Sequence, residues 1–242
     1  MAAWLWNLLL VYVLYTVCRL TFLWVNWDSY ADTLTWGHAF HLMLAGLRFD
    51  TSAIFYTNAL VMLLLMFPLH WKEKVAYYRV VHWIFVVINS ICLYTNLIDC
   101  VYFQFTGKRT TISVLSEFQH EGMGNMAKIM GEQFLANWYL VLLAAGLTWV
   151  LWKGFRQPKA TTPLPRKKGK RGSPLFFYYI TNALLMLGMI PLMVFGMRGG
   201  STHATRPITI SNANQYVNRP AETGIVLNTP FSIIRTFNKT PS

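Results

Sequence analysis

Charged side chains are scarce in this sequence, and acidic ones are the scarcest. Of the 242 residues, 12% are charged, 55% are hydrophobic and 16% are aromatic. Soluble domains carry about 25% charged residues. The composition therefore excludes an ordinary soluble domain and indicates a polytopic membrane protein.

The nine acidic residues are outnumbered by 21 Lys and Arg, which gives a formal net charge of +12. The basic residues lie in loops between apolar runs and do not form one basic face, so we do not expect nucleic acid as a partner. Anionic membrane lipid is the partner that this distribution favours. No pattern in the sequence indicates an oligomeric state.

Cysteine is also rare, and all three cysteines lie in or beside apolar runs. Cys92 and Cys100 are eight residues apart, about 12 Å along one helix, which is too far for a disulfide. A disulfide framework and a zinc motif are therefore excluded. Two other groups have metal-like spacing, but we interpret them as interfacial histidines and as a solvated helix face: His38 with His41, and Glu117 with His120 and Glu121.

Five apolar runs predict an all-α fold with five transmembrane helices, at residues 4–27, 52–69, 80–103, 135–152 and 175–197. Residues 1–197 would form this membrane domain, and residues 198–242 a short tail with helices starting near Ser211 and Thr229. Amphipathic stretches at residues 32–47 and 107–138 predict helices in the membrane interface.

Two polar features border the first two runs. Arg19 interrupts the first run, and the acids that follow it soonest, Asp28 and Asp32, are its expected partners. Asp50, with the Thr and Ser after it, offers an N-cap to the second run.

Basic residues are distributed unevenly between the loops. Residues 70–79 contain three Lys and Arg and residues 153–173 contain eight, whereas the longer loops after the first and third runs contain one and three. The positive-inside rule places the two basic loops in the cytoplasm. We therefore expect a cytoplasmic N-terminus and an extracytoplasmic C-terminus.

The third run carries a polar stripe. His82, Asn89 and Asn96 fall on one helix face, which Cys92 and Asp99 share. Unpaired polar groups are costly in hydrocarbon, so this stripe must face protein or water. Hydrogen bonding between helices is one interpretation, and the polar path of a small transporter or channel subunit is another.

With this orientation, six charged residues gather at the outer surface: Arg48, Asp50, Asp99, Lys108, Arg109 and Arg198. Ion pairing of Arg48 or Arg109 with Asp99 or Asp50 is one interpretation. The other is a binding site for a lipid headgroup, in which guanidinium groups hold a phosphate. Both interpretations fit the residue types.

Three segments together resemble a known family. They are GLRFDTSAIFYTN (residues 46–58), NLIDCVYFQFTGKRTT (residues 96–111) and the tail from RGGSTHATRPITISNANQYV to GIVLNTPFSIIRT (residues 198–236). The chain resembles the N-terminal membrane region of lipoteichoic-acid-synthase-like proteins, the membrane sulfatases and phosphoglycerol transferases of the alkaline phosphatase superfamily. The resemblance spans nearly the whole chain.

That resemblance implies a bacterial inner-membrane anchor that presents lipid to an extracytoplasmic catalytic domain. The family's catalytic domain uses a divalent metal and a threonine nucleophile on phosphate or sulfate esters. The sequence ends at Ser242, inside the linker-like tail, so no catalytic or metal residue can be assigned and no cofactor is expected in this chain. We expect it to be a fragment of a longer enzyme, inactive alone; a structural inner-membrane protein is a further alternative.

Overall fold

The computed structural model of the protein describes residues 2–66, 75–112, 132–133, 136–157, 174–199 and 207–237. This part of the chain is all-helical and contains no strand, as predicted. Its long helices are α1 (Ala2–Val25), α2 (Trp36–Met66), α3 (Val75–Thr106), α6 (Trp138–Gly154) and α7 (Pro174–Arg198).

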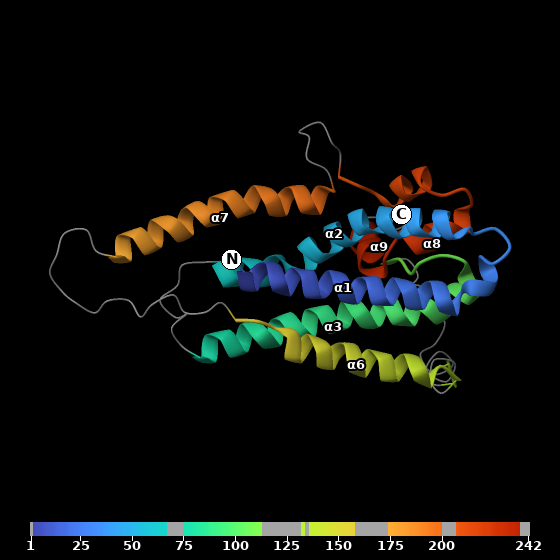
Figure 1. The fold of residues 1–242 in the computed structure, drawn as a ribbon, viewed down its shortest axis with the longest axis horizontal. Coiled ribbons are helices and arrows are strands. Elements are labelled where there is room, and N and C mark those ends of the chain that lie inside the picture. The colour runs from blue at the N-terminus through green and yellow to red at the C-terminus, as the bar shows by residue number, and fades with distance from the viewer. Residues whose placement is uncertain are drawn as a thin grey trace.

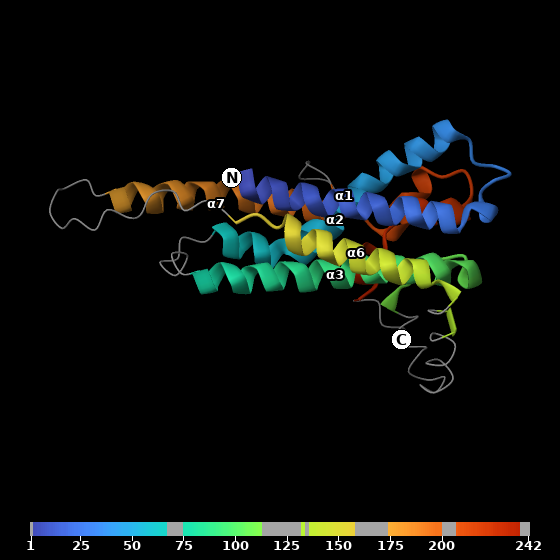
Figure 2. The same cartoon turned by 60° about the horizontal axis from the view of Figure 1, so that its bottom comes forward.

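The long helices lie side by side and alternate in direction (Figures 1 and 2). Contacts between their ends agree with this arrangement. Trp6 at the start of α1 donates to the Gly154 carbonyl at the end of α6, and Asn26 just after α1 donates to the Cys100 carbonyl near the end of α3. Helix α7 packs mainly on α2.

Two of these helices are long and apolar enough to cross a membrane, judged by length and composition: Ala3–Val25 and Ala76–Thr106. Trp138–Gly154 and Met186–Arg198 are shorter apolar helices. The structure therefore gives modest support for a membrane protein. Among the predicted runs, the first, third, fourth and fifth correspond closely to α1, α3, α6 and α7.

Helix α2 differs from the expectation. We predicted an interfacial helix at residues 32–47 and a separate span starting with a cap at Asp50, but one helix runs from Trp36 to Met66. The proposed capping groups have other partners. Asp50 binds Arg19, and Ser52 donates to the Met197 carbonyl of α7. The second predicted interfacial stretch, residues 107–138, lies largely outside the described residues.

The tail folds back onto the bundle. Its helices are η3 (Ile210–Gln215), η4 (Pro220–Glu222), α8 (Thr223–Val226) and α9 (Thr229–Thr236). Both predicted helix starts are confirmed to within two residues. Helix α8 packs on α2, and α9 packs on α2 and α3. Figure 1 shows the tail at the end of the bundle where α1 and α3 end and α2 begins; we call this the tail end.

Candidate functional site

A buried ion pair joins α1 to α2 at the tail end. Arg19 donates to both carboxylate oxygens of Asp50, over 2.8 and 2.6 Å, and the two side chains are 3% and 0% exposed. The predicted partners of Arg19, Asp28 and Asp32, are exposed in the loop beyond α1, so that prediction is wrong. Gly46 makes the close approach possible, because a Cβ there would lie 2.3 Å from the guanidinium carbon.

The tail completes this pair. Asn228 donates from its side-chain nitrogen to Asp50 over 2.8 Å, and its side-chain oxygen accepts from the Phe231 amide to cap α9. Arg19 also donates to the Val226 carbonyl over 3.3 Å. One asparagine therefore both starts α9 and fixes it to the carboxylate of α2.

Asp99 of α3 is the centre of a second buried group and is fully buried. Its carboxylate accepts from the Thr229 hydroxyl over 2.7 Å and from both the amide and the hydroxyl of Thr110. Asn96, one turn earlier, accepts from the Thr229 amide over 3.0 Å. Residues of α3 thus bind the first turn of α9 through both its backbone and its side chain.

Arg109 forms an ion pair with the Asp99 carboxylate. Its Nη1 is 3.6 Å from Asp99 Oδ2, and its Nε donates to the Gly224 carbonyl over 2.9 Å. The guanidinium carbon lies 3.7 Å from the centre of the Phe22 ring, within cation–π range. Arg109 is 6% exposed and connects α3 to α8 through the tail backbone.

The four buried charges balance. Arg19 and Arg109 carry two positive charges, and Asp50 and Asp99 carry two negative ones. All four belong to the two ion pairs, and each of them also forms a hydrogen bond with the tail. We call this set, with Asn96, Asn228 and Thr229, the tail-binding network. A balanced and buried network of this kind stabilises a packing arrangement and leaves no charge for an added anion.

The polar stripe of α3 faces protein. Asn89 and Asn58 of α2 exchange two hydrogen bonds of 3.0 and 2.7 Å, and each amide also donates to a carbonyl one turn earlier in its own helix. His82 forms a hydrogen bond of 3.0 Å with the Trp152 carbonyl and stacks on Phe155. These contacts join α3 to α2 and α6.

The remaining residues of the predicted headgroup site lie around this network. Arg48 is half-buried and binds the Gly199 carbonyl and the Tyr216 hydroxyl. Lys108 is exposed, and Arg198 is half-buried at the end of α7. The structure thus brings Asp99 and Arg109 together but places Asp50 with Arg19, a residue that was not in the predicted set.

His38 binds an acid of the tail. Its Nε2 lies 3.0 Å from Glu222, whose carboxylate also accepts from the amides of Asn218 and Arg219. Burial alone would raise the pKa of Glu222, but these hydrogen bonds outweigh burial and lower it. His41 stacks near His38. Within the described residues, no three His, Cys, Asp or Glu side chains gather as metal ligands, and Glu117, His120 and Glu121 lie outside them.

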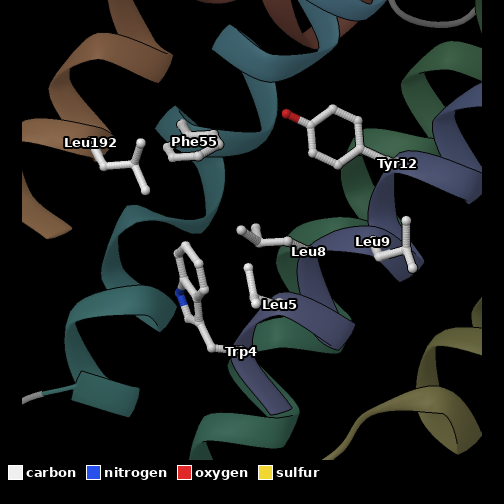
Figure 3. A pocket seen from close by; sticks show the side chains of 7 residues that line it. All are labelled: Trp4, Leu5, Leu8, Leu9, Tyr12, Phe55 and Leu192. Carbon is white, nitrogen blue, oxygen red and sulfur yellow. The ribbon is translucent and has the colours of Figure 1, made fainter. Parts of the chain in front are cut away.

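An apolar groove of about 420 Å³ lies away from the network, between α1, α2 and α7. Figure 3 shows its lining: Trp4, Leu5, Leu8, Leu9, Tyr12, Phe55 and Leu192. No residue of the polar stripe lines it. The Tyr12 hydroxyl donates a hydrogen bond to Thr51.

Sequence reasoning gave Arg19 the wrong partners and did not place Asn228, Thr229 or Arg235 in a polar cluster. For Asn228 a signal was present, because an Asn two residues before Pro230 is typical of an N-cap.

Comparisons of the chain with protein-family models, with curated proteins and with solved structures find no match. The functional argument therefore depends on the residues themselves.

Proposed function

We propose that this chain is the membrane anchor of a lipoteichoic-acid-synthase-like sulfatase or phosphoglycerol transferase. In this proposal, α1, α2, α3, α6 and α7 are five spans of a bacterial inner membrane. The N-terminus is cytoplasmic and the tail is extracytoplasmic. The alternating helix directions support such a topology, because the helix ends that border the two basic loops lie at the end opposite the tail. These are the end of α2, the start of α3, the end of α6 and the start of α7.

The observation that carries the proposal is the tail-binding network. The three segments that resemble the family are distant in sequence, yet each contributes to this network. Asp50 comes from the first, Asp99 and Arg109 from the second, and Asn228 and Thr229 from the third. Three motifs that contribute to one buried network support membership of the family better than three motifs that make no contact with one another.

The network also gives the anchor a mechanical role. Because α8 and α9 are bonded to α1, α2 and α3, a domain attached beyond the tail would be held at a fixed place above the membrane. Fixed placement of reacting groups is a large part of catalysis. We therefore propose that the anchor positions a catalytic domain, which would act on the headgroup of a membrane lipid or on a phosphate or sulfate ester.

The first experiment measures the mass of the native protein in its membranes, with an antibody against residues 153–173. The proposal expects a species much heavier than 27.9 kDa. A native species of 27.9 kDa would contradict a covalent catalytic domain. Transport through the bundle would then be the function to test, by flux through reconstituted protein and its loss in Asp99→Asn.

The second experiment uses the native enzyme with Asn228→Ala. Loosening the tail should reduce turnover of phospholipid in vesicles by about tenfold or more and leave turnover of a small soluble phosphate ester unchanged. Asn214→Ala, an exposed tail asparagine, is the matched control. Equal loss on both substrates would show that the tail does not act by positioning.

A further inference from the structure

Two arginines hold the last turn of α7. Arg48 of α2 donates from Nε to the Gly199 carbonyl over 2.7 Å. Arg235 of α9 donates from Nη2 to the Met197 carbonyl over 2.8 Å and to the Ser52 hydroxyl over 3.3 Å. The two guanidinium groups therefore bind carbonyls only two residues apart, at the tail end of the bundle.

These arginines carry more positive charge than their surroundings neutralise. The C-terminus of a helix is equivalent to about half a negative charge, which leaves about 1.5 positive charges. None of the ion pairs formed between described residues involves Arg48 or Arg235. The adjoining stretches 200–206 and 238–242 contain no Asp or Glu. The single acid after Arg198, Glu222, binds His38.

The side chains around the arginines are hydrogen-bond donors. Arg48 donates to the Tyr216 hydroxyl over 3.1 Å, and Arg235 donates to the Tyr56 hydroxyl over 3.5 Å. Because each hydroxyl oxygen already accepts a hydrogen bond, its own proton remains to be donated. Within the described part of the chain, Arg235 Nε has no acceptor. Both arginines are half-buried and so retain an exposed surface.

An anion with several acceptor oxygens and no proton to donate complements such a group. Phosphate has this chemistry, and arginine binds it through charge-assisted hydrogen bonds. A carboxylate offers fewer oxygens. The tail-binding network, in contrast, has equal numbers of positive and negative charges. Unneutralised positive charge therefore lies beside the end of α7, whereas the charges around Asp99 neutralise one another.

We propose that Arg48 and Arg235, assisted by Tyr56 and Tyr216, form a binding site for a phosphate mono- or diester. The phosphate belongs either to an anionic lipid headgroup or to a soluble ester. The lipid source rests on the proposed function, whereas phosphate binding itself does not. Arg235 is the new member of the site, and the buried Asp50, Asp99 and Arg109 are not part of it.

The test titrates the purified chain, in an uncharged maltoside detergent, with three compounds: dihexanoyl phosphatidylglycerol, glycerol phosphate, and dihexanoylglycerol, which lacks phosphate. Binding is measured by calorimetry. We expect binding of the phosphate compounds and none of dihexanoylglycerol. Arg48→Gln and Arg235→Gln should each weaken binding by about tenfold or more. Arg219→Gln, which changes an exposed tail cation, should leave it unchanged.

Arginines that act only as helix caps would also lower stability when removed, so a second pair of variants is needed. Tyr56→Phe and Tyr216→Phe retain both carbonyl contacts and should still weaken binding several-fold. Wild-type protein that binds no phosphate compound, or variants that bind as tightly as Arg219→Gln, would overturn the site.

The same titrations distinguish the two possible sources of the phosphate. Binding of phosphatidylglycerol alone identifies a lipid headgroup, and binding of glycerol phosphate with similar affinity identifies a soluble ester. A native mass of 27.9 kDa together with phosphate binding would remove the anchor proposal and leave this site standing. A heavy native species that binds no phosphate compound would overturn this site and leave the anchor proposal standing.

Discussion

Asn228 and Asp50 are 178 residues apart in sequence, and a hydrogen bond of 2.8 Å joins their side chains inside the bundle. The same asparagine caps α9 through the Phe231 amide. Both residues are buried, at 3% and 0% exposure. One side chain therefore contributes both to the docking of the tail and to the formation of its last helix.

Asn228→Ala should destabilise the protein by about 2.5–4 kcal/mol. Loss of the cap costs about 1 kcal/mol, and loss of a buried hydrogen bond to a charged group costs about 1.5–3 kcal/mol. Thermal unfolding in detergent measures the total, and limited proteolysis reports release of the tail. Asn214→Ala should change neither. Equal protection of the tail in the two variants would contradict the role of Asn228.

Two glycines of α2 make a matched pair for a packing test. A Cβ at Gly46 would lie 2.3 Å from the Arg19 guanidinium carbon, whereas a Cβ at Gly37 would meet nothing within 4 Å. The guanidinium cannot easily move away, because it donates two hydrogen bonds to Asp50. Gly46→Ala should therefore destabilise by about 3–5 kcal/mol, as expected when a buried ion pair is disturbed.

Gly37→Ala should instead be neutral or stabilise by up to about 1 kcal/mol, because it only restricts the unfolded chain. Thermal unfolding of both variants, side by side, measures the difference. A loss of stability at Gly46 no larger than that at Gly37 would mean that Arg19 can give up its contact with Asp50 at little cost.

The positions of the long helices were predictable because long apolar runs are visible directly in composition. Residues 80–103 lie inside α3, for example, and residues 175–197 inside α7. The start of α2 was not predictable in the same way. A string of Asp, Thr and Ser is typical of an N-cap, but here the side chains of Asp50 and Ser52 bind other helices, and tertiary contacts override the local signal.

The partners of the buried charges were harder to predict than the helices. Asp28 is nine residues from Arg19, yet it is exposed, and the partner is Asp50 on the next helix. A short separation in sequence favours an ion pair when both residues lie on the same helix, and Arg19 and Asp28 do not. Arg235 was missed for a related reason: its role depends on the place where α7 ends, which no pattern within the tail reveals.

Glu222 makes the docking of the tail dependent on pH. Its pKa in the folded protein is lowered from the ordinary value of 4.5. A carboxyl group with a lowered folded pKa contributes stability above its unfolded pKa and loses that contribution as the pH falls through the folded pKa. Stability should therefore decrease as the pH is lowered below about 4.5, and this component should be absent in Glu222→Gln.

For Glu222 we would measure the melting temperature in detergent between pH 3 and pH 7, with unfolding monitored by circular dichroism. Asp28→Asn, which removes an exposed acid, is the control and should retain the wild-type pH dependence. If Glu222→Gln and Asp28→Asn gave the same profile, the hydrogen bonds from His38 and from the amides of Asn218 and Arg219 would not stabilise the charged carboxylate.

The paired amides of Asn58 and Asn89 allow a direct measurement of one polar contact between helices. Each amide donates to the other and to a carbonyl of its own helix, so neither has an unmet donor. Asn89→Leu alone should destabilise by about 1–3 kcal/mol, because it leaves the amide of Asn58 buried and half-satisfied.

The double variant Asn58→Leu with Asn89→Leu should lose less stability than the two single variants added together, because two apolar side chains need no partner. Thermal unfolding of the four proteins gives a coupling energy, which we expect to lie between about 0.6 and 1.7 kcal/mol, the average and the largest value found for hydrogen bonds between membrane helices. Asn89→Leu combined with Asn214→Ala, two residues with no common contact, should be additive. A coupling near zero for Asn58 and Asn89 would mean that each amide finds an equally good partner when the other is removed, and the polar stripe of α3 would then owe its burial to apolar packing alone.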